Sequence, residues 1–138
     1  MLVLVTGGSG LVGKSIQSIV EKTHLDELDD YIFLSSSQCD LRKDEEVEKL
    51  FNKHKPDIVI HLASLVAGLY VNMDNNYTFL IDNIKINTNI LECCNKFKVK
   101  RLINILSTCV FPEQSEHNNL VYPLTSNQIL NGRPHSSN

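Results

Sequence analysis

The sequence lacks an excess of charge of either sign, and it lacks a long hydrophobic run. Its 138 residues carry 16 acidic and 13 basic side chains, a formal net charge of -3, with no run of five like charges. Because nucleic-acid binding needs a basic field that gathers phosphates, this balance argues against a nucleic-acid partner. No stretch approaches the ~18 apolar residues that span a bilayer, and the first residues lack a basic signal segment. We therefore expect no membrane partner either.

Cysteine is scarce and lacks any ligand or redox spacing. The four cysteines are Cys39, Cys93, Cys94 and Cys109, and they contain no Cys-x-x-Cys. A disulfide between the adjacent Cys93 and Cys94 would be strained. We therefore predict reduced thiols in a cytoplasmic protein. The histidines are also scattered without the spacing of metal ligands, so we predict no metal site.

Apolar residues make up 42% and charged residues 21% of the chain, as in a globular domain, and the length suits one domain. Short apolar runs without polar alternation, typical of strands buried on both faces, alternate with segments whose apolar residues recur every three or four positions. We predict strands at 3–5, 31–34, 57–62 and 101–106 and helices at 11–22, 44–54 and 76–98. Such alternation produces right-handed crossovers, so we predict an α/β fold with a doubly wound parallel sheet, truncated after about four strands.

Two of the predicted helices have an apolar face that we expect to be covered. For 11–22 that face consists of Leu11, Val12, Ile16, Ile19 and Val20. For 76–98 it consists of Leu80, Ile84, Leu91 and Cys94, with Ile90 and Phe97 beside it. Residues 107–138 are rich in Ser, Asn and Pro, and we predict a loop with one short helical turn there. A loop of this length is abnormal in a compact domain, so we expect either a substrate loop or a chain that stops early.

A glycine-rich loop joins the first predicted strand to the first helix. Gly8, Gly10 and Gly13 form G-x-G-x-x-G in the strand-to-helix context in which that motif binds a dinucleotide. Side chains there would obstruct the tight turn, keep the pyrophosphate off backbone N–H groups and hold the helix off the sheet. We therefore predict a Rossmann-like dinucleotide site. Its loop residues are Gly7, Gly8, Ser9, Gly10, Leu11, Val12 and Gly13.

The same loop also fits the phosphate-loop pattern of ATPases and GTPases, G-x-x-x-x-G-K-[ST], from Gly8 to Ser15. Such an enzyme needs an Asp at the end of a further apolar strand to hold magnesium, and no predicted strand ends in one. Leu11 and Val12 also fit an apolar helix face better than a loop that wraps phosphates. A glycine turn without a ligand is a third interpretation. We favour the dinucleotide site over both.

The position about 20 residues beyond the glycines bears on the choice between NAD and NADP. An acid there binds the ribose 2′-hydroxyl and repels a 2′-phosphate, but here the position holds Ser35 and Ser36. The nearby acidic pair starts the strand, roughly 13 Å from its ligand end. Serine hydroxyls, with Arg42 or Lys14 as cations, tolerate a phosphate, so we favour NADP. A solvated turn is the alternative interpretation of the serines.

Several of these segments together resemble the extended short-chain dehydrogenase/reductases. The first is the T-G-x-x-G-x-x-G motif at 6–13, and the second is His-Leu-Ala-Ser at 61–64, which closes the third predicted strand. Asp40-Leu41 resembles the adenine-binding pair of that family, and Asn83 with 89–92 resembles its long mid-domain helix. The resemblance adds five residues to the predicted cofactor site. They are Asp40, Leu41, Leu62, Ala63 and Ser64.

The segments 107–112, 122–124 and 131–138 narrow the resemblance to the GDP-L-fucose synthase family, and Ser-Thr-Cys-x-Phe-Pro at 107–112 is the most specific. The resemblance implies that NADPH reduces the ketone of GDP-4-keto-6-deoxy-D-mannose after epimerisation at two flanking carbons. Such a ketone needs a hydrogen bond and a proton on its oxygen, and epimerisation needs a base. By resemblance, Ser107 binds the ketone and Cys109 is the base, provided that its thiol pKa is lowered from about 8.5. A small apolar filler is the alternative role for Cys109.

The proton donor of that family, the tyrosine of Tyr-x-x-x-Lys, has no counterpart in the sequence. The residues four positions after the tyrosines are Ser35, Asp74, Ile81 and Ser126. We therefore expect 1–138 to be an incomplete NADP-binding Rossmann-type domain without a C-terminal substrate domain, inactive alone and homodimeric when full length. The alternative is a non-catalytic NAD(P)-binding or interaction module of the same fold.

Overall fold

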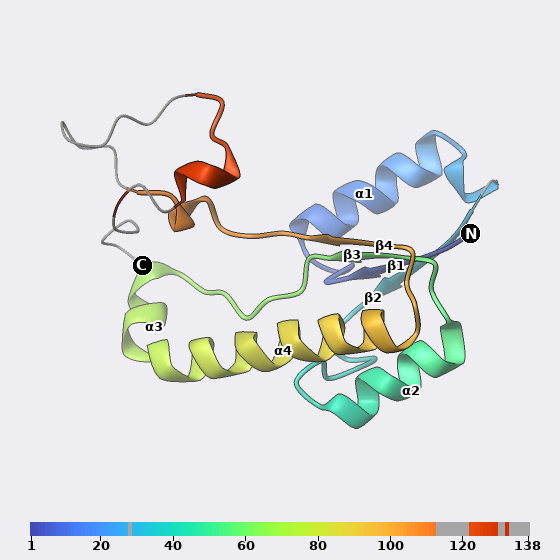
Figure 1. Cartoon of the computed structure of the whole chain (residues 1–138). Helices are drawn as coiled ribbons and strands as arrows, with labels where there is room; N and C mark the ends of the chain where they lie inside the picture. The colour runs from blue at the N-terminus through green and yellow to red at the C-terminus, as the bar shows by residue number, and fades with distance from the viewer. Residues whose placement is uncertain (28, 113–121, 130–131, 133–138) are drawn as a thin grey trace. The chain divides into compact units, whose positions relative to one another are not determined.

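The computed structural model describes residues 1–27, 29–112, 122–129 and 132. The chain divides into two compact units, Met1–Asn104 and Ile105–Asn138. The first unit contains the sheet and helices α1 to α4 (Figure 1). Whether 1–138 is one incomplete domain stays a prediction.

Four parallel strands form the sheet of the first unit, in the order β2-β1-β3-β4. They are β1 (Leu2–Thr6), β2 (Asp30–Leu34), β3 (Ile58–His61) and β4 (Arg101–Asn104). At the C-terminal end of β1, Thr6 lies opposite Leu34 of β2 and His61 of β3. The first three strands lie within one residue of their predicted ends, β4 ends at Asn104 and not at 106, and the parallel α/β architecture is confirmed.

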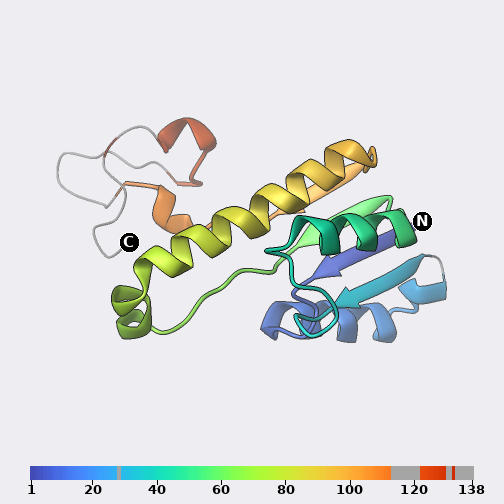
Figure 2. The same ribbon diagram turned by 90° about the horizontal axis from the view of Figure 1, so that it is seen from below.

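Helices cover both faces of this sheet. α1 (Leu11–Lys22) lies on one face, whereas α2 (Asp44–His54) and α4 (Asn76–Lys96) lie side by side on the other (Figures 1 and 2). A 3-10 turn, η1 (Leu25–Glu27), follows α1, and the short α3 (Leu69–Asp74) leads into α4. No helix within the described ranges is long and apolar enough to cross a bilayer.

The main core lies between the sheet and the layer of α2 and α4. Leu4 of β1 and Val59 of β3 are fully buried with Val47 and Phe51 of α2 and Ile90 of α4. Burying a large apolar side chain of this kind stabilises a fold by about 1.5–3 kcal/mol. This layer fixes α4 across the sheet.

The predicted covered face of α1 is only partly right. Gly13 and Val20 are buried, but Leu11 is 87% exposed, and Val12 and Ile19 are exposed as well. Successive helical residues turn by about 100°, so residues 13 and 20 share one face and the three exposed residues point away from it. Gly13 defines that face because its backbone packs directly on the glycine loop. Leu11 and Val12 therefore do not belong to a covered helix face. The inference drawn from such a face against a phosphate loop is wrong, and the missing Asp at a strand end still argues against that loop.

The predicted apolar stripe of α4 is wrong in three of its four positions. Leu80 is 60% exposed, and Ile84 and Leu91 are also exposed, whereas Ile90 and Cys94 are buried. The buried face is centred on Ile90 and also holds Ile86 and Cys93. The helix has apolar residues on two faces, and asparagine side chains that bond neighbouring loops occupy part of the covered one. Hydrophobic period alone could not separate the two faces.

The described part of the second unit contains two 3-10 turns, η2 (Thr108–Val110) and η3 (Ser126–Gln128), where the sequence predicted one short turn. Of the predicted family segment 131–138, only Gly132 lies within the described residues.

Candidate functional site

The loop after β1 can be built only from glycine where it approaches its neighbours most closely. Gly7 has a φ of +70°, and a Cβ there would lie 2.9 Å from the Ala63 backbone nitrogen. A Cβ on Gly8 would lie 2.7 Å from Phe33 Cβ, and one on Gly13 would lie 2.5 Å from the Gly7 oxygen. The loop therefore packs between β2 and the residues after β3, directly beneath the first turn of α1.

The first turn of α1 presents backbone donors to this loop. The Lys14 N–H donates to the Gly10 oxygen at 2.9 Å as the helix begins, and no side chain caps the helix. The N–H groups of Leu11, Val12 and Gly13 therefore lie outside the helical ladder, at the positive end of the helix dipole. A pyrophosphate is the kind of anion that such donors bind.

A buried hydroxyl at the end of β1 fixes the residues that follow β3. Thr6 Oγ1 accepts hydrogen bonds from the N–H groups of Leu62 and Ala63, each at 3.2 Å. It also lies 2.6 Å from His61 Nδ1. Because the two N–H groups occupy both lone pairs, the hydroxyl proton goes to His61 Nδ1, and the ring proton therefore resides on Nε2. This arrangement holds Ala63 against Gly7.

His61 is consequently a neutral positioning group. The residue is 3% exposed, and burial lowers its pKa to about 4. Its Nε2 has no hydrogen-bond partner among the described residues. Among the described residues the ring is therefore hydrogen-bonded at Nδ1 alone. A ring held in this state is unsuited to act as a base.

We expect Thr6→Val to lower the free energy of unfolding by about 1–3 kcal/mol, because the isosteric change leaves the buried His61 and Ala63 nitrogens unpaired. Thr6→Ser keeps the hydroxyl and serves as the matched control. Urea unfolding of the three chains measures the difference. Equal stability of the valine and serine variants would contradict this role for the hydroxyl.

The serines after β2 form an exposed turn. Ser35 Oγ lies 2.9 Å from Ser37 Oγ and from Gln38 Oε1, which also accepts the Ser35 N–H at 2.8 Å. Ser36 is exposed beside them. The turn follows the C-terminal end of β2, next to Gly8, whose N–H donates to the Leu34 oxygen at 2.8 Å. The predicted role of Ser35 and Ser36 toward a 2′-phosphate stays a prediction.

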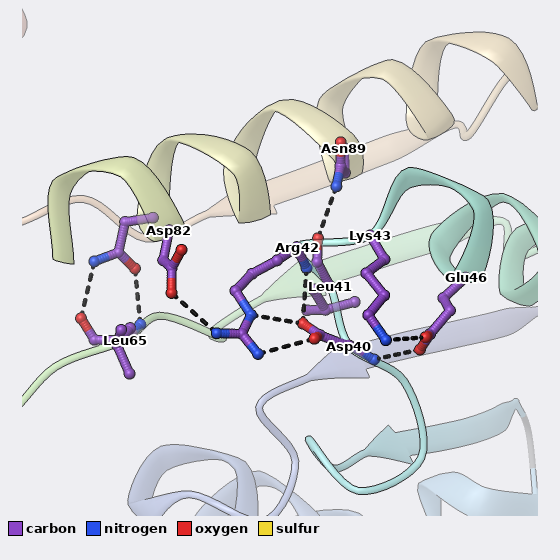
Figure 3. A network of polar contacts seen from close by, with 9 residues as sticks. Asp40, Leu41, Arg42, Lys43, Glu46, Leu65, Asp82 and Asn89 are labelled. Atoms are coloured by element: carbon purple, nitrogen blue, oxygen red, sulfur yellow. Dashed lines mark hydrogen bonds and ion pairs between the residues drawn. The ribbon is translucent and has the colours of Figure 1, made fainter. Parts of the chain in front are cut away.

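The predicted adenine-binding pair lies in the loop that follows, where Asp40 is ion-paired (Figure 3). Arg42 Nε and Nη2 donate to the two carboxylate oxygens of Asp40 at 2.8 and 2.9 Å, and Arg42 Nη1 donates to Asp82 at 3.0 Å. The hydrogen bonds from Arg42 hold the pKa of Asp40 at about 2. Arg42 is therefore paired with two carboxylates, and its role as a cation beside a 2′-phosphate stays a prediction. Lys14, exposed in the first turn of α1, is the other predicted cation.

The two predicted catalytic residues belong to the second unit. Ser107 directly precedes η2 and is exposed, and Cys109 lies in the middle of that turn. The Cys109 side chain lies outside the described part of the chain. The catalytic roles of both residues therefore stay predictions.

Sequence reasoning did not identify Asp82 as a site residue, and it quoted Thr6 and Asn83 only as parts of family motifs. All three make hydrogen bonds to loops that the sequence had placed in the cofactor site. The available signal was a polar residue at a covered position of a strand or helix. That signal becomes visible only when the covered face is known.

Comparisons with known proteins agree with this geometry. A sequence model of the NAD dependent epimerase/dehydratase family matches residues 3–135. The GDP-L-fucose synthase of Dictyostelium discoideum is 46% identical over 99% of this chain and 41% of its own length, and a probable GDP-L-fucose synthase of Drosophila melanogaster is 40% identical over 99% and 40%. A crystal structure of a GDP-L-fucose synthetase from Naegleria fowleri bound to NADP superposes with a TM-score of 0.83 at 43% identity, covering 99% of this chain and 39% of that one. The chain thus spans about two fifths of the length of these relatives.

Proposed function

Because the chain belongs to the NAD dependent epimerase/dehydratase family, we propose that it is the NADP-binding part of a GDP-L-fucose synthase. The full-length protein then reduces GDP-4-keto-6-deoxy-D-mannose with NADPH after epimerising it. The observation that carries this proposal is the geometry of the glycine loop. The loop packs against β2, Ala63 and α1, and backbone N–H donors remain available at the start of α1.

The described residues suit the parts of that cofactor. The N–H groups at the start of α1 bind the pyrophosphate, and the loops containing Ser35, Ser36 and Asp40 contact the adenosine half. Bound NADPH supplies the hydride. Ser107 donates a hydrogen bond to the substrate ketone, and Cys109 removes the proton beside it, as the family resemblance implies.

A titration of the purified 138-residue chain with NADPH and then NADH tests the cofactor proposal. We expect saturable binding with a preference for NADPH. Fluorescence measures the binding directly, and the melting temperature should rise with the ligand concentration. Magnesium with ATP or GTP is the control for a phosphate-loop enzyme and is expected to give no rise. A folded chain that binds neither dinucleotide would refute the proposed site.

We further propose that the 138-residue chain does not turn over substrate, because its sequence contains no Tyr-x-x-x-Lys. Losing one member of a catalytic unit commonly lowers kcat by orders of magnitude. An NADPH-consumption assay with the GDP-keto sugar, run beside a full-length GDP-L-fucose synthase, measures this. Turnover near that of the full-length enzyme would contradict it, whereas NADPH binding without turnover fits both the fragment and a non-catalytic module. Transcript sequence that continues past Asn138 into a Tyr-x-x-x-Lys favours the fragment.

We also propose a homodimer for the full-length protein, located in the cytoplasm. The dimer is supported by the apolar side chains that α4 leaves exposed, among them Tyr77, Leu80 and Ile84. Contiguous exposed apolar surface of this kind is typical of protein interfaces. The cytoplasmic location is supported by the free thiols of Cys39 and Cys93, which suit a reducing compartment.

A further inference from the structure

Helix α4 makes polar contacts with two loops that belong to different crossovers. One loop follows β2 and the other follows β3, and the two strands flank β1 on opposite sides. The contacts come from three side chains of α4, which are Asn83 and, labelled in Figure 3, Asp82 and Asn89. These contacts are hydrogen bonds between side chains of α4 and polar groups of the loops, so they are separate from the apolar packing beneath α4.

Asn83 forms two hydrogen bonds with the backbone of Leu65, one as acceptor and one as donor. Its Oδ1 accepts the Leu65 N–H at 2.7 Å, and its Nδ2 donates to the Leu65 oxygen at 2.8 Å. The same amide nitrogen donates to the Phe79 oxygen one turn back at 2.8 Å, which fixes the rotamer of Asn83 on the helix. A side-chain amide thus pairs with one peptide residue as a neighbouring strand would.

Asp82 and Asn89 hold the loop after β2 in a comparable way. Asn89 Nδ2 donates to the Leu41 oxygen at 2.9 Å, and Asp82, whose side chain is 15% exposed, accepts from Arg42. Arg42 in turn holds the carboxylate of Asp40. The predicted adenine-binding pair is therefore fixed to α4 at both of its residues.

The segment 62–65 forms one wall of the glycine loop, and β2, which leads into the loop held by Asp82 and Asn89, forms the other. The segment 62–65 is held at its first residues by Thr6 and at its last by Asn83, and between these anchors Ser64 is exposed and makes no hydrogen bond within the described residues. Ala63 lies against Gly7 on one side of the loop, and Phe33 of β2 lies against Gly8 on the other. Any shift of either wall changes the space available to a dinucleotide.

We propose that Asp82, Asn83 and Asn89 are positioning residues that set the spacing between the two walls of the dinucleotide site. This inference rests on the proposed function, because it assigns α4 a role in binding NADPH. α4 lies in the helical layer that covers one face of the sheet, and these three side chains bond the loops and not the glycine loop itself. Binding strength at the site then depends on helix side chains that do not touch the ligand.

Alanine substitutions along α4 test this inference in the 138-residue chain. We expect Asn83→Ala to raise the Kd for NADPH about tenfold and Asn89→Ala about threefold, measured well below the unfolding midpoint. The matched control is Asn95→Ala, an exposed asparagine of the same helix, which is expected to leave Kd unchanged. Backbone hydrogen exchange gives a second readout, because Asn83→Ala should speed exchange at 62–66 and Asn89→Ala at 39–43.

A substitution of Asp82 distinguishes a positioning role from a simple effect of its charge on NADPH binding. Removing its negative charge should strengthen the binding of an anionic ligand if charge alone matters, whereas loss of the anchor on Arg42 should weaken it. We expect Asp82→Ala to weaken NADPH binding about threefold and to have no further effect in an Arg42→Ala background.

Three results would overturn the inference while leaving the proposed function intact. They are wild-type NADPH affinity in both Asn83→Ala and Asn89→Ala, tighter binding in Asp82→Ala, and unchanged exchange in both loops. If the unsubstituted chain binds no NADPH while Asn95→Ala and wild type remain folded, the proposed function itself fails, and the positioning role fails with it.

Discussion

Gly13→Ala is expected to abolish measurable NADPH binding and to lower the free energy of unfolding by about 3 kcal/mol, at the upper end of what overpacking costs. The added Cβ would lie 2.5 Å from the Gly7 oxygen and 2.6 Å from Gly8 Cα and the Gly8 oxygen. All three atoms belong to the backbone, so no rotation of a side chain relieves the contact. The start of α1 must move away from the loop, and the donors that it presents move with it.

Two other glycines provide graded controls for this substitution. A Cβ on Gly10 would meet only the Gly7 oxygen at 3.2 Å, and one on Gly68 would meet nothing within 4 Å. Gly10→Ala should therefore weaken NADPH binding with a smaller loss of stability, and Gly68→Ala should resemble wild type. Urea unfolding and an NADPH titration of the three variants measure both effects. A Gly13→Ala chain that binds NADPH as the Gly68→Ala chain does would contradict the packing described for α1.

Lowering the pH from 6.5 to 4 is expected to remove about 3 kcal/mol of stability through His61 alone. Burial lowers the pKa of this ring to about 4, below its ordinary value of 6.5. Between pH 6.5 and pH 4 the His61 ring is protonated in the unfolded chain and neutral in the folded chain. The free energy of unfolding therefore falls as the pH falls. Each tenfold change in proton concentration across that window contributes about 1.4 kcal/mol. The physical cause is burial, because a protonated ring would have to hold its charge away from water in the folded chain, where His61 is 3% exposed.

Urea unfolding at several pH values between 7.5 and 4 measures this effect, and His61→Asn should flatten the pH dependence of the free energy of unfolding. The control His24→Asn changes an exposed histidine and is expected to leave that pH dependence as in the wild type. Carboxylates act in a lower range, because Arg42 holds the pKa of Asp40 at about 2 and Lys100 lowers that of Asp57. Their stabilisation is present above about pH 4 and is lost as the pH falls toward 2. An unchanged slope in His61→Asn would show that the acid sensitivity has another source.

The sequence by itself determined the four strands, the three long helices and the glycine loop, whereas the short α3 was not predicted. Unbroken apolar runs such as Val3–Val5 predict strands buried on both faces, and the glycine spacing predicts a loop into which backbone must pack closely. Both signals are local, because burial on two faces and close backbone approach restrict the residue types at each position. The family resemblance likewise followed from short contiguous motifs.

Only the tertiary structure decided which helix faces are covered and which polar groups pair. The apolar residues of α4 lie on two faces, and the sequence favoured Leu80 and Ile84, although the core packs on Ile90. Arg42 was one of two cations proposed near a phosphate, and nothing in the sequence indicated that Asp82, 40 positions away in the chain, pairs with it. The physical reason is that a hydrogen bond or an ion pair depends on atoms brought within about 3 Å by the packing of the whole sheet. Residue type and local period carry no information about that distance.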